Sequence, residues 1–155
     1  MTQVPLIVPQ GEGESLWVVE DLTVIVLEGA QTGGAFSLFD IHVSPGKGVP
    51  PHYHEREDET FIVTEGELTF WVDGKTVTAR AGDVVHGPRG VPHQFTNTSS
   101  APARLYVIAT PAGLEAFFRS IGDRVEHPDG AAPAIDFARL TAGCEAHGIR
   151  LLPPA

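Results

Sequence analysis

The sequence predicts an antiparallel β-barrel or β-sandwich followed by two helices, and three observations lead to this fold class. Short segments rich in β-branched and aromatic residues recur between residues 16 and 109, separated by Gly, Pro and Asp turn signals. After Pro111 the apolar residues change to helical spacing. Strands do not alternate with helices, so the pattern does not favour βαβ units and a parallel sheet.

The first strands lie in residues 16–28, which are strongly β-branched. We interpret this segment as two short strands broken at Glu20-Asp21, and the sequence 31–34 as a turn. A further strand covers residues 35–43. Side chains alternate along a strand, so one face of it carries Ser37, Phe39, Ile41 and Val43.

The central strands are closely spaced and joined by short turns. Asp73-Gly74 is a strong hairpin signal, because Asp-Gly suits a turn with positive φ at both central residues. The predicted strands of this region are 60–64, 68–72, 75–79, 84–86, 93–96 and 103–109.

The chain divides into three parts. Residues 1–15, rich in Pro, Gly and Glu, form an N-terminal arm, residues 16–110 form the barrel, and residues 111–155 form a C-terminal helical extension. Helical spacing in the extension is shown by Leu114, Phe117, Phe118 and Ile121, and again by Phe137, Leu140 and Cys144. We expect Cys144 to be a buried, unreactive residue, and the last five residues to be docked or frayed.

Composition excludes several classes of partner. Twenty acidic and ten basic residues give a formal charge of −10, without any Lys/Arg cluster. Such a surface repels phosphate backbones and anionic lipid heads, so we expect neither nucleic-acid nor membrane binding. One cysteine excludes an intramolecular disulfide. The N-terminus lacks the features of a signal peptide, and the expected location is the cytoplasm.

A pair of histidines points to a possible metal site. In His52-Tyr53-His54, residues two apart on an extended chain direct both imidazoles to one side. Glu59 follows five residues after His54, and a straight strand would place it on the opposite face. The charged run 55–58 must therefore bend if Glu59 is to rejoin the histidines. The residues alone leave a second interpretation open, in which these are separate surface or core histidines.

The spacing around these residues resembles the two motifs of the cupin family. The first motif, G-x5-H-x-H-x3–4-E-x6-G, is matched without departure by Gly46, His52, His54, Glu59 and Gly66. The second motif, G-x5-P-x-G-x2-H-x3-N, is matched without departure by Gly82, Pro88, Gly90, His93 and Asn97. Ten fixed positions in the correct order are a specific signal. The motifs cover residues 46–97, and the strand pattern extends the likeness to about residues 20–110.

The resemblance implies a double-stranded β-helix, which is a jelly-roll barrel of two antiparallel sheets, here with C-terminal helices. It implies that His52, His54, Glu59 and His93 hold one divalent transition metal ion per chain. Nitrogen and oxygen donors suit Fe, Mn, Ni, Co, Cu or Zn, and the donor set does not choose among them. The glycines and Pro88 would be turn residues, Asn97 a strand-end hydrogen-bonding residue, and one motif pair indicates a single cupin domain.

The resemblance also implies a function. The chain is similar to quercetin dioxygenase-like cupins, so we expect a dioxygenase acting on a small oxygen-rich aromatic or enediol substrate, with Glu59 as a general base. The alternatives are a non-redox isomerase or cyclase, and a module that binds a small molecule through the metal. Cupin folds support all of these activities, and the fold does not choose among them.

Five residues are candidates for the substrate pocket. By alternation with Glu59 and His93, the apolar side chains of Phe61, Val63 and Phe95 face inward. Tyr106 is a candidate for a hydroxyl group at the rim of the pocket. His86 is a candidate for an acid or base at its mouth. The competing interpretations are barrel core for the aromatic residues and a surface or sheet-packing role for His86. Exposed sheet edges are commonly covered by a second subunit, so we also expect a homodimer.

Overall fold

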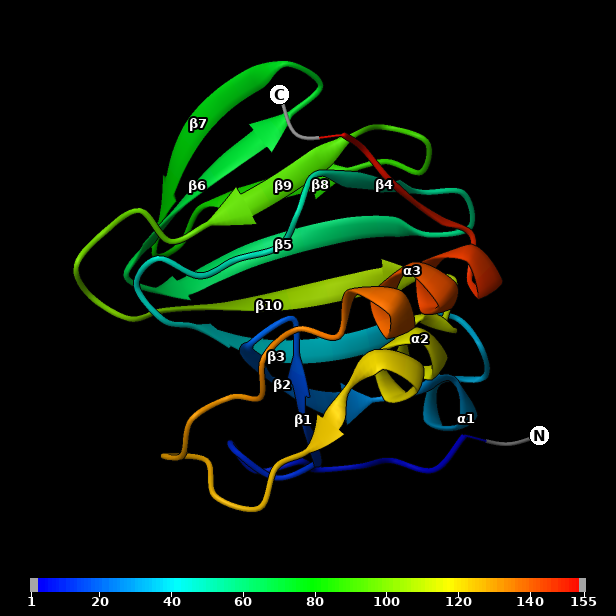
Figure 1. The fold of residues 1–155 in the computed structure, drawn as a ribbon. Coiled ribbons are helices and arrows are strands. Elements are labelled where there is room, and N and C mark those ends of the chain that lie inside the picture. Colours follow the sequence, from blue (N-terminus) through cyan, green and yellow to red (C-terminus); the bar gives the residue numbers. More distant parts are fainter. Residues whose placement is uncertain (1–2, 154–155) are drawn as a thin grey trace.

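The strands form two antiparallel sheets that face each other (Figure 1). The computed structural model describes residues 3–153, which include all the elements named below. In this part of the chain the larger sheet contains seven strands, in the order β11 (Asp123–Arg124), β1 (Glu14–Val18), β2 (Asp21–Leu27), β3 (Ser37–Val43), β10 (Ala103–Thr110), β5 (Asp58–Glu65) and β8 (Val84–Gly87). The smaller sheet contains five, in the order β12 (Ile149–Leu151), β4 (His52–His54), β9 (His93–Thr96), β6 (Glu67–Val72) and β7 (Lys75–Arg80).

The chain repeatedly crosses from one sheet to the other. From β3 in the larger sheet it passes to β4 in the smaller, returns to β5, and crosses again to the β6–β7 hairpin. It then alternates once more through β8, β9 and β10. This winding makes the barrel a double-stranded β-helix, which confirms the predicted fold class.

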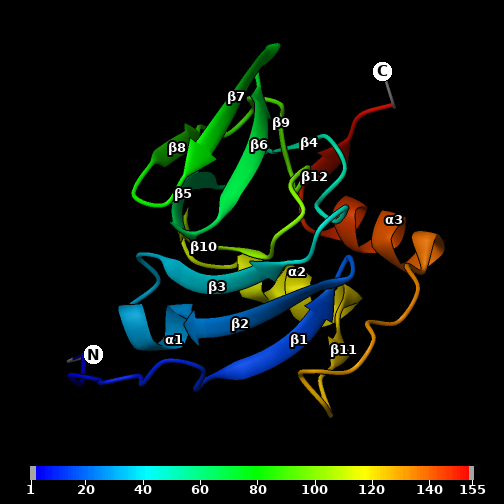
Figure 2. The same cartoon turned by 90° about the vertical axis from the view of Figure 1, so that its left-hand side faces the viewer.

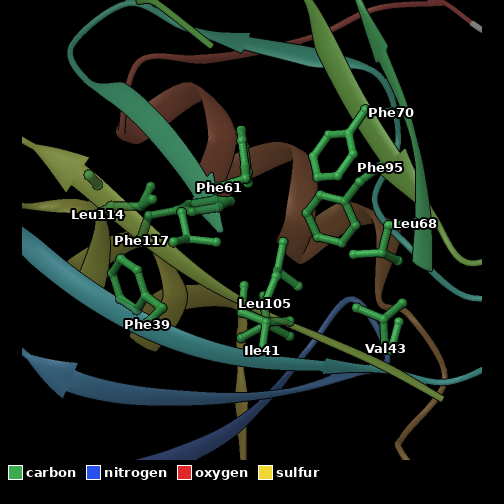
Figure 3. Packing of buried hydrophobic residues seen from close by; sticks show 14 of the residues in the cluster. Phe39, Ile41, Val43, Phe61, Leu68, Phe70, Phe95, Leu105, Leu114 and Phe117 are labelled. Carbon is green, nitrogen blue, oxygen red and sulfur yellow. The ribbon is translucent and has the colours of Figure 1, made fainter. Parts of the chain in front are cut away.

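The inward faces of the two sheets form one hydrophobic core (Figure 3). Phe39 and Ile41 of β3 are buried on the larger sheet, as the alternation predicts. Across the barrel, the ring of Phe61 packs against those of Phe70 and Phe95, with centroids 5.3 and 6.0 Å apart. Aromatic pairs at such distances add about 0.5–1.5 kcal/mol beyond their area burial. The core therefore holds both sheets in the positions from which the site is built.

Two helices cover one end of the barrel (Figures 1 and 2). The described helices are α1 (Gly29–Thr32), α2 (Leu114–Ile121) and α3 (Phe137–Ala146). Helices α2 and α3 pack against each other and bury Phe117, Leu140 and Cys144 toward the barrel. The side chain of Asp136 caps α3 by accepting a hydrogen bond from Arg139 N at 3.0 Å. None of the helices within residues 3–153 combines the length and apolarity of a membrane span.

The structure differs from the sequence-based expectations at short elements. Residues 14–15 belong to β1, although the predicted arm included them, and the predicted turn 31–34 overlaps α1. The C-terminal extension is not purely helical, because its strands β11 and β12 pair with β1 and β4. Edge strands of two or three residues are too short to show an alternating pattern in the sequence. Residues 1–2 of the predicted arm and 154–155 of the tail lie outside the described residues.

Asn97 joins the end of β9 to the neighbouring strands. Its side-chain amide donates to the carbonyl oxygens of Val43 at 2.9 Å and Ala101 at 2.8 Å, and its Oδ1 accepts from Ser99 N at 3.0 Å. Asn97 is 1% exposed, so water cannot replace these bonds. This agrees with the strand-end role that the motif implies.

We expect Asn97→Ala to destabilise the barrel by about 2–3 kcal/mol, because it leaves buried carbonyl groups unpaired. The free energy of unfolding in urea is the measurement. Ser99→Ala, which removes only hydroxyl contacts at a more exposed site, is the control and should cost about 1 kcal/mol or less. A loss below 1 kcal/mol for Asn97→Ala would show that the amide does not hold these strands together.

Candidate metal centre

Strands from both sheets supply the four motif residues. His52 and His54 lie two residues apart on β4, and His52 is paired directly with His93 on β9. Glu59 lies on β5 of the opposite sheet, in register with Gly87 of β8. Residues 55–57 connect β4 of one sheet to β5 of the other, with a bend at residues 55–56. The predicted bend is therefore present. It allows Glu59 to face the two histidines although it lies an odd number of residues after His54.

The four side chains converge on one point. One ligand atom from each of His52, His54, Glu59 and His93 lies within 4.8 Å of all the others. Glu59 Oε1 is 2.7 Å from His54 Nε2 and 3.0 Å from His93 Nε2. The Nε2 atoms of His52 and His54 are 3.1 Å apart. Three of these residues are buried and His52 is half-buried, so the cluster lies in the barrel interior.

Each imidazole is oriented by a hydrogen bond on its outer nitrogen. Nδ1 of His52 faces the carbonyl oxygen of Pro50 at 2.7 Å, and Nδ1 of His93 faces that of Val91 at 3.1 Å. Nδ1 of His54 faces the carboxylate of Glu57 at 3.3 Å. These acceptors favour the tautomer with the proton on Nδ1, which leaves the Nε2 lone pairs directed into the cluster.

This donor set fits a divalent cation. With protons on Nδ1, the Nε2 lone pairs of His52 and His54 face each other at 3.1 Å, which is unfavourable unless a positive charge lies between them. The carboxylate of Glu59 brings negative charge to the same point. Imidazole nitrogen and carboxylate oxygen are ligands for Fe, Mn, Co, Ni, Cu or Zn, and the cluster contains no thiolate that would select a softer metal.

The closeness of the cluster side chains in the barrel interior also shifts the pKa values of His52, His54 and Glu59. Burial disfavours the charged forms of both His54 and Glu59, but their mutual attraction outweighs it, so the pKa of His54 is raised and that of Glu59 is held well below its usual range. Burial, followed by the neighbouring His93 and His54, lowers the pKa of His52 to about 3. The cluster thus stabilises positive charge next to Glu59 and keeps His52 neutral, as a metal ligand must be.

A cavity opens from the cluster into the barrel. All four cluster residues line it, together with Phe61 and Phe95, and most of its remaining wall is apolar. Residues of α2 and α3, among them Leu114, Phe117 and Cys144, close one side. Burial raises the pKa of the Cys144 thiol to about 11, in keeping with the unreactive role expected for it. The cluster thus faces a largely apolar space inside the barrel, of the kind in which small molecules bind.

Three of the five predicted pocket residues lie elsewhere. Val63 is buried in the core beyond the cavity wall. Tyr106 alternates with the inward-facing Leu105 and Val107, so its ring lies on the outer face, 5.9 Å from the Arg104 guanidinium carbon. His86 is exposed and bonds to Thr60 Oγ1 at 3.0 Å, on the opposite face of β5 from Glu59. The assignments of Val63, Tyr106 and His86 to the pocket are therefore corrected.

Sequence reasoning missed two polar residues of the cavity wall, Asp21 and Thr23 on β2. Asp21 is 2% exposed, and neither of its carboxylate oxygens has a hydrogen-bond partner among the described residues. In the sequence it belongs to the polar pair Glu20-Asp21, which is typical of a solvated turn. The single available signal was its position at the start of a strand, followed by Thr23 on the same face.

The stability of the protein is expected to depend on Asp21 in a pH-sensitive way. Burial, assisted by Glu20 and opposed by Lys47, raises the pKa of Asp21 from 3.8 to about 8. Between about pH 5 and pH 8 the unfolded chain has released this proton while the folded chain retains it. The folded state therefore loses stability as pH rises through this window, by up to about 1.4 kcal/mol per pH unit.

Asp21→Asn removes this titration, so the stability of the variant relative to the natural chain should increase from pH 5 to pH 8. Urea unfolding of both proteins across that range is the measurement. A stability difference that does not change with pH would mean that Asp21 ionises in the folded protein much as it does in the unfolded chain.

Comparisons with known proteins agree with this fold. Residues 39–109 match the model of the cupin domain. The chain is 31% identical to quercetin 2,3-dioxygenase of Bacillus subtilis (strain 168) over 153 residues, which is 97% of this chain and 45% of that enzyme. The chain thus spans less than half the length of this relative.

Solved structures show the same barrel. A predicted oxalate decarboxylase of Thermotoga maritima superposes with a TM-score of 0.63 at 24% identity, covering 68% of this chain and 99% of that one. A sugar phosphate isomerase of Silicibacter pomeroyi superposes with a TM-score of 0.53 at 30% identity, over 59% of each chain. The fold and the cluster define a double-stranded β-helix protein with a three-histidine, one-carboxylate site. The chain belongs to the cupin superfamily.

Proposed function

We propose that the chain holds one divalent transition metal ion at His52, His54, Glu59 and His93. We propose further that it acts as a dioxygenase on a small, oxygen-rich aromatic or enediol substrate. One observation carries this proposal: the four-residue cluster lines a largely apolar cavity inside the barrel. Structural metal sites tend to be closed by their protein ligands, whereas this cluster faces space that a second molecule can enter.

A redox-active ion held here would bind a chelating oxygen pair of the substrate and make the bound molecule reactive toward dioxygen. The chain's own residues supply the surroundings. Phe61 and Phe95 exclude water beside the cluster and offer flat apolar surfaces to an aromatic substrate. Dry surroundings strengthen the electrostatic interactions between Glu59 and a charged or polar group beside it.

Glu59 is the candidate general base. Its carboxylate is buried at the wall of the cavity, where an arriving substrate hydroxyl would lie within reach of it. In this role Glu59 accepts the hydroxyl proton on a carboxylate oxygen, and its neighbour His54 lies 2.7 Å from that group. Similarity to quercetin 2,3-dioxygenase of Bacillus subtilis supports a hydroxylated aromatic substrate of the flavonol type.

The test is coupled consumption of substrate and oxygen. Metal-loaded protein is mixed with quercetin, and flavonol absorbance and dissolved oxygen are followed together. We expect one oxygen molecule consumed per flavonol, and neither reaction in protein treated with a chelator. Consumption of flavonol without oxygen, or of neither with any of the six metals, would contradict the dioxygenase assignment.

A second candidate is a non-redox isomerase, and the likeness to the Silicibacter pomeroyi sugar phosphate isomerase at 30% identity favours it. In this case a redox-silent ion would polarise a substrate carbonyl, and Glu59 would move a proton between carbon atoms. Conversion of a sugar phosphate without oxygen uptake would support this candidate. Tight binding of a small molecule with no turnover would instead indicate a binding module.

A further inference from the structure

A second polar position lines the cavity, apart from the metal cluster. Asp21 is almost fully buried, its two carboxylate oxygens lack partners among residues 3–153, and the residue belongs to the cavity wall. Thr23 lies on the same face of β2, two residues further along, and lines the cavity too. A buried polar group without a hydrogen-bond partner destabilises the folded state. The unpaired carboxyl of Asp21 therefore lowers the stability of the folded state, and no hydrogen bond within the described residues compensates for it.

The hairpin that presents Asp21 adds to this cost. Val19 and Glu20 connect β1 to β2 with φ values of 49° and 69°. Positive φ is unfavourable for a β-branched residue such as Val19, which also lines the cavity. An ion pair between Glu20 and Lys47, with the charged atoms 2.8 Å apart, connects this turn to the loop after β3. Strain of this kind is retained where the surrounding structure enforces it, and it is frequent at ligand sites.

The topology separates Asp21 from the metal cluster. Strand β2 carries Asp21, β5 carries Glu59, and β3 and β10 lie between them in the same sheet. Three strand spacings amount to about 14 Å across the sheet. Apolar side chains line the intervening part of the cavity, including Ile41 of β3 and Val107 of β10. The cavity wall thus has a polar residue on each of β2 and β5, with apolar residues on the two strands between them.

We propose that Asp21 binds a hydroxyl group at the end of the substrate remote from the metal cluster. The proposal rests on the proposed function, because it assigns the other end of the same molecule to the four-residue site. A hydroxyl group would satisfy the carboxyl of Asp21, and the apolar middle of the substrate would fill the space beside Ile41 and Val107. The substrate class is then a rigid, largely apolar ring system with a chelating oxygen pair at one end and a hydroxyl at the other.

The protonation of Asp21 supports a hydroxyl partner. Burial raises the pKa of this carboxyl to about 8, with Glu20 acting in the same direction and Lys47 opposing it. At neutral pH the group is therefore uncharged and can donate and accept a hydrogen bond at once, as a hydroxyl can. Such a pair satisfies both partners without placing a net charge in the apolar cavity.

The test compares two flavonols that share the chelating group. Quercetin carries additional ring hydroxyls, whereas 3-hydroxyflavone lacks them, and both are titrated into metal-loaded protein under nitrogen with fluorescence as the readout. We expect Asp21→Leu to weaken quercetin binding about tenfold, in line with one buried hydrogen bond, and 3-hydroxyflavone binding less than about twofold. An equal effect on both flavonols, or no effect on either, would overturn the assignment.

Two further variants control the result. Glu12→Gln removes an exposed carboxylate that does not line the cavity, and it should leave both affinities unchanged. Asp21→Asn keeps hydrogen-bonding capacity and should fall between the natural chain and Asp21→Leu. If Asp21→Leu does not fold, Asp21→Asn tests the assignment in its place, by the same comparison of the two flavonols. Since Asp21 has no partner to lose, both variants are expected to unfold at or above the natural temperature.

A separate measurement keeps this inference independent of flavonol chemistry. If the natural chain binds neither flavonol, the proposed substrate class fails, and phenol and toluene are then titrated into metal-free protein by NMR. These molecules differ only by a hydroxyl in place of a methyl group. A preference for phenol that Asp21→Leu abolishes would support the Asp21 site, whereas no preference, or one that Asp21→Leu retains, would reject it.

Discussion

Replacing His54 with alanine is expected to lower the affinity for a divalent metal by more than about a hundredfold. Loss of outer hydrogen-bonding partners alone typically costs 10–100-fold, and His54 is a direct ligand candidate. His54 is buried, and its Nε2 lies 2.7 Å from Glu59 Oε1 and 3.1 Å from His52 Nε2. Its removal takes one donor from the cluster and leaves the Glu59 carboxylate without its nearest partner.

The measurement is a competition titration with a chromophoric chelator, followed by metal analysis of dialysed protein. His86→Ala is the matched control, because His86 is an exposed histidine of the same barrel that lies outside the cluster. The control should retain its metal fully. Equal metal content in the natural chain and in His54→Ala would show that His54 is not a ligand of the metal.

Glu59→Gln is expected to keep a measurable share of the metal while slowing turnover by about 10²–10⁴-fold, the usual contribution of a general base. Glutamine has the size of glutamate and keeps one carbonyl oxygen as a donor to the metal. It cannot accept a proton from a substrate hydroxyl at neutral pH. Metal affinity should also fall, since a neutral amide replaces the carboxylate beside His54 and His93.

Turnover is compared at saturating metal, so that loss of affinity does not count as loss of catalysis. Glu57→Gln is the control carboxylate: it bonds to the outer nitrogen of His54 at 3.3 Å and does not line the cavity. This variant should weaken metal binding yet turn over normally once loaded. Turnover of loaded Glu59→Gln within a few-fold of the natural rate would reject Glu59 as the base.

Much of the metal cluster could be predicted from the sequence because its signals are local. His52 and His54 share a face by the period of two, and turn residues at fixed spacings surround the other two members. The glycines of these turns need positive φ, as Gly46 and Gly90 show with values of 80° and 79°. A requirement of this kind depends on the local backbone, so it is visible in the sequence.

The cavity wall was less predictable, because it depends on which face of each strand turns inward. Tyr106 lies between two apolar neighbours, Leu105 and Val107, whose burial directs it outward. His86 pairs with Thr60, which alternates with Glu59, so it faces away from the site. Alternation along β10 and β5 accounts for both positions. Asp21, by contrast, looks like an ordinary polar turn residue, and its burial follows only from the tertiary packing of hairpin β1–β2 against the opposite sheet and the helices.

Elemental analysis of the metal content tests the central claim most directly. The chain is purified without added metal and without a histidine tag, then measured as isolated and after loading with each of Fe, Mn, Co, Ni, Cu and Zn in turn. We predict about one ion per chain, bound with nitrogen and oxygen donors alone. A chain that retains no ion under any of these conditions would contradict the account, however closely the four side chains converge.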